Sequence, residues 1–519
     1  MALDQKGCFM NRRRFLASTA AALATAYAYP GLAQSPVSVH GFPASELYRV
    51  PYIENTPVPE YRFAPAGSYE AFQDMKFGVR IHWGIYSIWH RGAESWPFLQ
   101  MSLDDRQKYN ALYKTWNPAG FDANTWMDSF MESGMKMFTF TTKHHEGFSM
   151  FDTRTRVKNR ANWTAEGGPS IEACDLAYSI VETPFGRDVV KELCDAAHKR
   201  DIKINLYFSH PDWYDADFRP YVAHPFQIPS SAKWMAPADL QFSRQKLGDH
   251  AVIVPDPTDA EVKRMMERHC AQLVELLTNY GKIDMIDLDM WLGPRVWPEL
   301  RKTVLKLRQI QPDVMLRDRG IGNYGDYFTP ERVVPGSKET TDKPWFTIYP
   351  LGTDFSYEPD AAKYKGTEWI VHNLADAVAK GGGLQVGVGP SAHGEFHPEA
   401  IRQMKAAGAW LKVNGEAIYA TRPRKGSLWS EGETVRYTRS KDRRFVYAVL
   451  TTWPGKQIVL KSVRPTADSR VTLLGSDVRL SWKPDSERGT IITLPENLQQ
   501  ADNRPCEYAW TLKFNMTEA

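Results

Sequence analysis

Two aspartates, Asp287 and Asp289, lie at the end of a short apolar segment that begins at Ile283. Gly281 precedes this segment and a Gly-Pro pair follows it at 293–294, a pattern that predicts a buried strand. A carboxylate in a buried strand costs free energy unless it is paired or used in chemistry. The two acids therefore suit catalysis, but from this segment alone they could equally cap loops or pair with arginines.

An amphipathic helix is predicted immediately before the aspartates. Its apolar face recurs at three- and four-residue spacing and comprises Val262, Met265, Met266, Leu273, Leu276 and Leu277. Gly281 supplies the stop signal after Tyr280. A helix, a buried strand and acids at the end of that strand together describe one unit of a β/α barrel, in which chemistry takes place at the C-terminal ends of the strands.

Five further segments have strand character, and amphipathic helical patterns such as residues 189–200 lie between them. The six predicted strands span residues 77–82, 137–142, 204–208, 285–289, 314–316 and 384–388. Strands that alternate with helices favour a parallel sheet. We expect an α/β fold with a catalytic (β/α)8-like barrel of the TIM type. A seventh strand is expected near residues 332–339, and the eighth has no assigned position.

Polar and aromatic side chains follow the last apolar residue of these strands. They are His82 with Trp83, His144 with His145, His210, Asp289 with Trp291, and Arg317 with Arg319. A lone histidine would more often be structural, but strand ends converge on one pocket in a barrel. Imidazoles, arginine and indoles around a carboxylate suit a polyhydroxylated ring, because polar groups bond its hydroxyls and indoles pack on its C–H faces.

Metal and phosphate chemistry are less well supported. Adjacent histidines such as His144 and His145 should point to opposite sides of an extended segment, and no H-E-x-x-H pattern occurs. The glycines at 381–383 precede a strand rather than a helix, unlike a phosphate-binding loop. We expect neither a metal nor a cofactor. Hydrolysis of a glycosidic bond instead uses two carboxyl groups, and a second one is needed beside that of Asp289. Glu339 and Asp342 are both candidates, and the residues alone do not decide between them.

The first 34 residues predict an export signal. Asn11-Arg-Arg-Arg-Phe-Leu16 is a twin-arginine pattern, and a short apolar run and small residues follow it up to Ala33-Gln34. Four basic residues and one acid in this segment account for the whole-chain charge of +3, so the remainder is formally neutral. We expect a periplasmic or secreted protein that binds neither nucleic acid nor, after cleavage of the signal, a membrane.

The rest of the chain divides into three further parts. Residues 35–64 lack periodicity and predict an N-terminal arm, and residues 65–422 form the expected barrel. From 423 onward the pattern changes to short β runs, which predict a C-terminal antiparallel β-sandwich. These runs are 435–438, 445–451, 457–460, 471–474 and 490–494. Oligomeric state is not indicated.

Four ordered stretches resemble the α-L-fucosidases of glycoside hydrolase family 29. They are 76–87 (KFGVRIHWGIYS), 141–148 (TTKHHEGF), 276–284 (LLTNYGKID) and 387–390 (GVGP) with 410–419 (WLKVNGEAIY). The resemblance runs from about Tyr61 to Leu512. It implies a barrel followed by a β-sandwich. It also implies hydrolysis of terminal α-L-fucosyl residues of glycans, with retention, through a covalent glycosyl-aspartate.

The resemblance also implies roles for individual residues. The family pattern I-D-x-x-W-F-D-G, laid on residues 283–290, makes Asp289 the nucleophile. Lys338-Glu339-Thr340 aligns with the segment that carries the acid/base in many members, so Glu339 is expected in that role. The implied sugar-binding residues are His82, Trp96, His144, His145, Tyr207 and Arg319, and Asp287 and Trp291 are expected beside them.

The departures from the family pattern include three positions near the expected site. Asp287 stands at a tryptophan position, Met290 at a glycine position and Ser95 at a glutamate position. Loss of the indole removes an apolar wall suited to a methyl group, and a carboxylate there could bond an added hydroxyl. An α-L-glycosidase for an L-galactose-like sugar is therefore a second hypothesis. A non-catalytic carbohydrate-binding protein is a third, which the retention of Asp289 disfavours.

Overall fold

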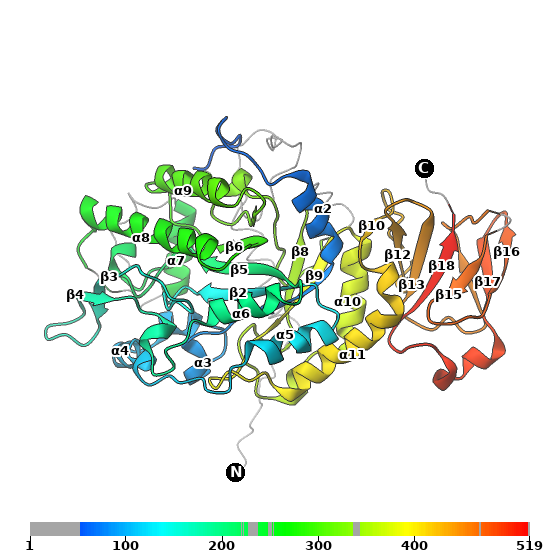
Figure 1. The fold of residues 1–519 in the computed structure, drawn as a ribbon, viewed down its shortest axis with the longest axis horizontal. Helices are drawn as coiled ribbons and strands as arrows, with labels where there is room; N and C mark the ends of the chain where they lie inside the picture. The colour runs from blue at the N-terminus through cyan, green and yellow to red at the C-terminus, as the bar shows by residue number, and fades with distance from the viewer. Residues whose placement is uncertain are drawn as a thin grey trace, which may run out of the picture.

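Seven parallel strands form the centre of the larger domain (Figure 1). The computed structural model describes residues 52–219, 221, 223–226, 237–247, 252, 254–335, 343–466 and 469–516. The strands are β1 (Phe77–Ile81), β2 (Met137–Lys143), β5 (Lys203–Ser209), β6 (Met285–Asp289), β7 (Met315–Leu316), β8 (Phe346–Pro350) and β9 (Gly383–Val388). Their order in the sheet is β7-β6-β5-β2-β1-β9-β8. All six predicted strands are confirmed, and β8 was missed.

An irregular segment occupies the remaining position between the two edge strands. Its backbone forms isolated parallel β-bridges with both edges of the sheet. The paired residues are Arg317 with Tyr327, Phe328 with Trp345, and Glu331 with Ile348. Residues 327–331 therefore take the place of a strand between β7 and β8 and connect the edges of the curled sheet. The seventh strand predicted at 332–339 is not found in its described part, residues 332–335, and residues 336–339 lie outside the described residues.

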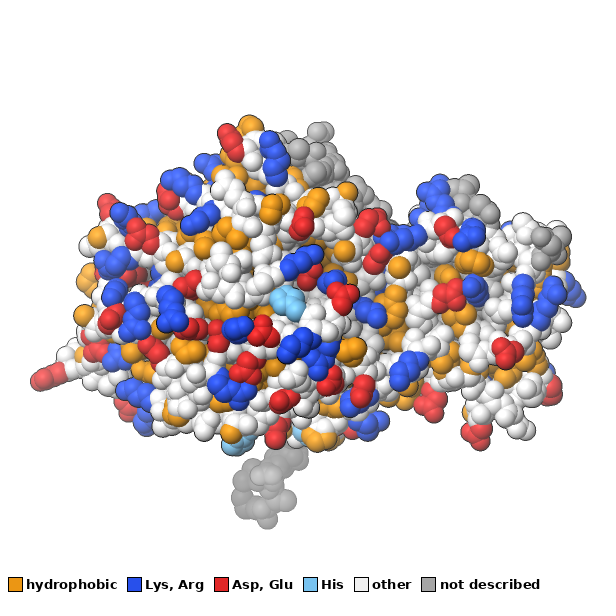
Figure 2. All heavy atoms as spheres, in the orientation of Figure 1, with side chains coloured by type: hydrophobic (Ala, Val, Ile, Leu, Met, Phe, Trp, Pro, Cys, Tyr) orange, Lys and Arg blue, Asp and Glu red, His pale blue; other side chains and the backbone are white. Residues whose placement is uncertain are grey.

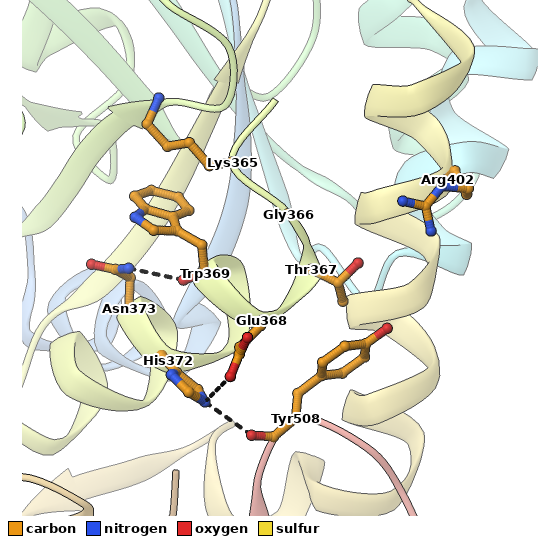
Figure 3. A pocket seen from close by; sticks show the side chains of 9 residues that line it. All are labelled: Lys365, Gly366, Thr367, Glu368, Trp369, His372, Asn373, Arg402 and Tyr508. Atoms are coloured by element: carbon orange, nitrogen blue, oxygen red, sulfur yellow. Dashed lines mark hydrogen bonds and ion pairs between the residues drawn. The ribbon is translucent and has the colours of Figure 1, made fainter. Parts of the chain in front are cut away.

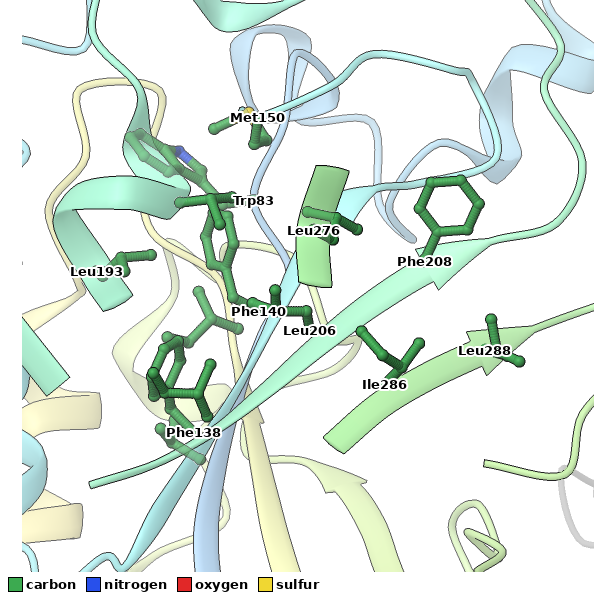
Figure 4. Packing of buried hydrophobic residues seen from close by; sticks show 14 of the residues in the cluster. Trp83, Phe138, Phe140, Met150, Leu193, Leu206, Phe208, Leu276, Ile286 and Leu288 are labelled. Atoms are coloured by element: carbon green, nitrogen blue, oxygen red, sulfur yellow. The ribbon is translucent and has the colours of Figure 1, made fainter. Parts of the chain in front are cut away.

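Helices pack against the outer face of the sheet. The longer ones are α5 (Ala123–Glu132), α6 (Val189–His198), α8 (Asp259–Thr278), α9 (Trp297–Ile310), α10 (Thr367–Ala379) and α11 (Pro398–Asn414). The helix predicted before the aspartates is α8, which begins with a capping box formed by Thr258 and Glu261. Figure 4 shows the packing of helix residues such as Leu193 and Leu276 near strand residues such as Phe140 and Leu206.

Shorter elements complete the larger domain. They are α2 (Ala66–Met75), α3 (Tyr86–Trp89), α4 (Leu103–Tyr109), α7 (Pro237–Leu247), the 3-10 turn η2 (Trp96–Gln100), and the hairpin of β3 (Val157–Asn162) and β4 (Ser170–Leu176). Residues 52–64, the described part of the predicted arm, pack on the barrel. The Tyr61 hydroxyl is bonded by Arg308 of α9, and Glu54 accepts a hydrogen bond from the Trp297 indole.

The C-terminal domain consists of two antiparallel sheets around their own apolar cluster. One sheet has the order β10-β12-β13-β18-β15, with β11 beside β12, and the other has the order β14-β17-β16. The strands are β10 (Thr421–Pro423), β11 (Ser430–Glu431), β12 (Val435–Ser440), β13 (Phe445–Leu450), β14 (Gln457–Leu460), β15 (Val471–Leu473), β16 (Ser481–Asp485), β17 (Gly489–Thr493) and β18 (Trp510–Asn515). The predicted sandwich is confirmed.

The surface carries both signs of charge, interspersed over both domains (Figure 2). This agrees with the balanced composition of the chain beyond residue 34. Among the described residues, no helix is long and apolar enough to cross a membrane.

Close contact between α11 and α5 generates a stability prediction. A Cβ added at Gly408 would lie 2.0 Å from the Glu132 carbonyl oxygen and 2.6 Å from Ser133 Cα. Alanine is the better helix former by about 1 kcal/mol. We nevertheless expect Gly408→Ala to lower the free energy of unfolding by roughly 1–3 kcal/mol, because backbone atoms cannot yield cheaply.

Gly67→Ala in α2 is the matched control, because a Cβ there meets no atom within 4 Å. Its denaturant midpoint should equal or exceed that of the wild type. A Gly408→Ala protein as stable as Gly67→Ala would contradict the proposed packing of α11 on α5.

Candidate active site

Asp289 lies at the C-terminal end of β6 and is held on both carboxylate oxygens. Oδ1 is 2.8 Å from Arg319 Nη1 and 3.7 Å from Arg317 Nη1. Oδ2 accepts a hydrogen bond of 2.7 Å from the Tyr207 hydroxyl. The residue is 8% exposed. A nucleophile requires such an arrangement, in which a carboxylate oxygen is fixed at a strand end and a small part of its surface is accessible to a substrate.

The surroundings keep this carboxylate ionised. Burial alone would raise the pKa of Asp289, but Arg319 and Arg317, with the Tyr207 hydrogen bond, hold it well below its usual value. Burial and the carboxylate raise the pKa of Tyr207 well above 10, so its hydroxyl remains a neutral donor. Asp289 is therefore negative throughout the neutral range.

Asp287 lies one layer deeper in the barrel, on the same side of β6, since residues i and i+2 of a strand share a face. It is fully buried, and its two oxygens accept hydrogen bonds from Arg80 of β1 and from Arg317. The expected contact of Asp287 with a sugar hydroxyl does not agree with this placement. Pairing with arginines, the alternative left open by the sequence, is what the structure shows.

Glu331 is a carboxylate at the site that the sequence analysis missed. Its Oε2 is 3.1 Å from Arg319 Nη2, so one guanidinium bridges Asp289 and Glu331. The Glu331 side chain is 38% exposed. It ends the irregular segment 327–331, whose Thr-Pro-Glu sequence does not resemble a strand. The bridge to Ile348 places it at the same end of the barrel as Asp289.

Six side chains thus form one series of alternating charge, which we call the charge ladder. From the interior to the surface it runs Arg80, Asp287, Arg317, Asp289, Arg319 and Glu331. Each carboxylate of the pair on β6 lies between two guanidinium groups. Because arginine stays charged when buried, this arrangement stabilises negative charge at Asp289 without a metal.

His145 completes the surroundings of Asp289. Its Nε2 is 4.0 Å from Asp289 Oδ2, and its Nδ1 is 2.6 Å from Ser209 Oγ. Ser209 donates its proton to the Pro211 carbonyl, so His145 Nδ1 must be the donor to Ser209 and Nε2 keeps a lone pair. Burial lowers the pKa of His145 well below 6.5. The His145 ring is therefore neutral, and its unprotonated Nε2 is on the side of Asp289.

His144 and His145 follow β2 in a loop, and their ring centroids are 4.1 Å apart. The expectation that they point to opposite sides is wrong, because the chain is no longer extended there. His144 Nδ1 is 2.6 Å from Ser95 Oγ. Among the described residues, no group of three His, Cys, Asp or Glu side chains is arranged to hold a metal ion.

The other predicted sugar-binding residues surround these groups. His82 lies 5.7 Å from both the His144 and the Tyr207 rings. Trp96, at the start of η2, lies 4.7 Å from His145. Trp291 is linked to Trp96 through Phe242, with ring separations of 5.4 and 6.4 Å. The structure thus brings His82, Trp96, His144, His145, Tyr207 and Arg319 together around Asp289, with Trp291 at the edge of this group.

Glu94 is a second acid that sequence analysis missed. It is 8% exposed, and its Oε1 has no hydrogen-bond partner among the described residues. Burial raises the pKa of Glu94 to about 7, with His144 and Arg332 opposing and Asp354 and Glu331 adding to the effect. Glutamate is thus present next to Ser95, one residue before the position at which the family pattern has it.

The backbone conformation of Met290 explains why the family pattern has glycine at this position. Its φ is +63°, in the left-handed region that non-glycine residues rarely adopt. A methionine there stores strain of roughly 1–3 kcal/mol. The backbone turns here so that Asp289 points into the barrel end.

Glu339, the predicted acid/base, falls in the gap between residues 335 and 343 and lies outside the described residues.

Comparisons with known proteins agree with this geometry. The Alpha-L-fucosidase family model matches residues 65–416, and the Alpha-L-fucosidase C-terminal domain model matches residues 430–515. The human tissue alpha-L-fucosidase is 28% identical over 491 residues, which cover 89% of this chain and 90% of the human protein. The rat plasma alpha-L-fucosidase is 27% identical over 475 residues, covering 85% and 90% of the two chains.

Solved structures share the fold. A covalent intermediate of a GH29 alpha-L-fucosidase from Bacteroides thetaiotaomicron, in complex with 2-fluoro-fucosyl fluoride, has a TM-score of 0.68 and 22% identity. The alignment covers 89% of this chain and all of that one. Alpha-L-fucosidase isoenzyme 1 from Paenibacillus thiaminolyticus has a TM-score of 0.67 and 23% identity, with coverage of 87% and 99%. The protein described here belongs to the alpha-L-fucosidase family of glycoside hydrolases.

Proposed function

We propose that the protein hydrolyses terminal α-L-fucosyl residues of glycans with retention, using Asp289 as the nucleophile. The observation that carries this assignment is the ionised carboxylate at the end of β6, held by Arg319, Arg317 and Tyr207. Asp289 Oδ attacks the anomeric carbon, and the bond to the leaving oxygen breaks. Water then attacks the glycosyl-aspartate from the face that the leaving group vacated, which restores the original configuration and frees Asp289.

The proton donor to the leaving oxygen is a glutamate at the barrel end. We favour Glu331, because it shares Arg319 with Asp289 and its partial exposure lets it exchange protons with water. After protonating the leaving group, its carboxylate takes a proton from the incoming water. Glu339 remains the alternative from the sequence. In either case a separation of about 5–5.5 Å between the two carboxyl groups is expected for retention.

Fucose is favoured over an L-galactose-like sugar. The second hypothesis depended on Asp287 as an acceptor for an added hydroxyl, and both oxygens of Asp287 are bonded to arginines instead. Glu94, with its unpartnered Oε1 beside His144, is the acid better placed for a sugar hydroxyl. The non-catalytic hypothesis is disfavoured because the charge ladder keeps Asp289 ionised.

We further propose that the protein acts after export through the twin-arginine route, in the periplasm or outside the cell. The support is the pattern Asn11-Arg-Arg-Arg-Phe-Leu16 with the apolar run behind it. These residues precede the described part of the chain. Export of folded cargo would suit a barrel whose buried charge ladder must be assembled completely before the protein is stable.

The role of Asp289 is tested with Asp289→Ala. We expect turnover of an aryl α-L-fucoside to fall by roughly 10³-fold or more, since the covalent step is lost. Sodium azide should restore part of the turnover and yield a glycosyl azide of inverted configuration. Substantial turnover without azide would contradict the assignment.

The control is Asp287→Asn rather than Asp287→Ala. Alanine would leave Arg80 buried without an acidic partner and Arg317 with Asp289 alone, at a cost of roughly 3–5 kcal/mol, whereas asparagine keeps a hydrogen-bond acceptor. Asp287→Asn should lower stability and activity, and azide should not restore the activity. Rescue of Asp287→Asn by azide would mean that the wrong aspartate had been chosen.

Glu331→Gln and Glu339→Gln distinguish the two candidate acids. The true acid variant should lose about 10²-fold or more on a phenyl α-L-fucoside but little on the 2,4-dinitrophenyl analogue, whose leaving group needs no proton. We expect this pattern for Glu331→Gln; its appearance in Glu339→Gln alone would restore the original assignment.

A further inference from the structure

A second cleft, of about 560 Å³, lies on the outside of the barrel at the start of α10 (Figure 3). One wall is the first turns of α10, with Trp369, His372 and Asn373. Arg402 of α11 and Tyr508, from the segment that leads into β18, form the other side. The cleft therefore lies where the barrel and the C-terminal domain meet.

Tyr508 is held rigidly at this cleft. Its φ is +70°, which for a bulky residue costs roughly 1–3 kcal/mol. The conformation persists because neighbouring groups fix the backbone. His372 Nε2 donates to the Tyr508 carbonyl at 2.9 Å, and the Trp410 indole donates to the next carbonyl, that of Ala509, at 2.8 Å. The aromatic ring is thus presented by a segment that has little freedom to move.

Trp369 provides a second aromatic surface. It is half-buried, and its ring lies 5.3 Å from Tyr349, edge to face. None of the described residues accepts a hydrogen bond from its indole N–H. Asn373 Nδ2 donates to the Trp369 carbonyl, which leaves the amide oxygen of Asn373 for another donor. The cleft therefore offers two aromatic rings together with amide, imidazole and guanidinium groups.

A connecting loop joins this cleft to the catalytic site. Residues 351–366 run from the end of β8 to α10, and in this fold a helix begins on the face where the preceding strand ends. Near the start of the loop, the Phe355 ring lies 5.1 Å from His82. At its other end, Lys365 lines the cleft and donates to the Pro350 carbonyl at 2.5 Å. The loop thus contacts both sites, one near each of its ends.

We propose that this cleft binds a saccharide chain, as an auxiliary site for the glycan whose terminal sugar occupies the catalytic site. The proposal rests on the proposed function for the choice of ligand. Aromatic rings pack on the C–H faces of pyranose rings, and amide and guanidinium groups bond their hydroxyls. A fixed aromatic on a strained turn is preorganised for this contact, which reduces the entropy lost on binding.

The test measures glycan binding with the catalytic site blocked. The full-length protein carrying Asp289→Asn is applied to an array of plant, algal and animal oligosaccharides in saturating L-fucose. We expect at least one oligosaccharide class to be retained. Adding Trp369→Ala should weaken its binding by about tenfold, the loss of one aromatic contact. Adding Arg402→Ala, an exposed substitution on α11, should weaken the same binding.

Two controls make the result decisive. Trp482→Ala removes a half-buried indole from β16, away from the cleft, and should leave binding unchanged. Folding is verified by activity in proteins that keep the wild-type Asp289. There, hydrolysis of an aryl α-L-fucoside should stay within twofold of wild type for each of the variants Trp369→Ala, Arg402→Ala and Trp482→Ala. Lack of wild-type activity on the aryl fucoside would count against the proposed function, whereas the array would still report on the cleft.

The proposal is overturned by any of three results. These are no oligosaccharide retained in L-fucose, retention that Trp369→Ala does not change, or an equal loss in Trp482→Ala. Loss through Trp369→Ala alone, with Arg402→Ala unchanged, would contradict the proposed contact between Arg402 and the saccharide.

Discussion

The charge ladder is the constraint on which the rest of the site depends. Two aspartates of one strand are buried with three arginines, and a buried charge without a partner would be prohibitive. Asp287 is acceptable only because Arg80 of β1 and Arg317 reach it, and Asp289 only because Arg317 and Arg319, which follow β7, reach it. The barrel makes this possible by bringing the ends of strands that are distant in sequence to one place. The same pairing keeps Asp289 ionised, so stability and catalysis share one set of contacts.

Packing farther out holds the ends of the ladder in place. Arg319 also donates to the Thr329 carbonyl, which fixes the irregular segment that carries Glu331. His210 follows β5 and stays neutral at neutral pH, because burial lowers its pKa to about 4. Its backbone N–H donates to the Asp289 carbonyl, and its Nε2 donates to the Arg319 carbonyl. The C-terminal domain supports the far side of the barrel, where Arg436 of β12 pairs with Asp376 of α10. The sandwich thus braces a barrel helix without contributing to the described surroundings of Asp289.

Sequence reasoning located the elements with strong periodicity and the residues that directly follow them. Strand β6, helix α8 and the residues His82, His144, His145 and Arg319 were predictable because they lie in or directly after periodic or apolar segments, whereas Tyr207 was expected only from the resemblance to the family. Strand β8 was missed because Pro344 precedes it and Pro350 ends it, and proline within a run argues against a central strand. Glu331 was missed for a related reason, since a Thr-Pro-Glu segment bridged to its neighbours only at isolated residues has no strand pattern. The pairing of Asp287 with Arg80 could not be predicted, because Arg80 lies about two hundred residues earlier in the chain.

The central claim is that Asp289, and no other acid of the site, bonds to the sugar. The most direct measurement uses 2-deoxy-2-fluoro-α-L-fucosyl fluoride, whose fluorine at C2 slows hydrolysis of a glycosyl-enzyme. Mass spectrometry of the proteolysed protein should find one fluorofucosyl group, on the peptide that contains Asp289, with fragment ions that place it on that residue rather than on Asp287. A label on Asp287, Glu94 or Glu331, or no label together with a product of inverted configuration, would contradict the account.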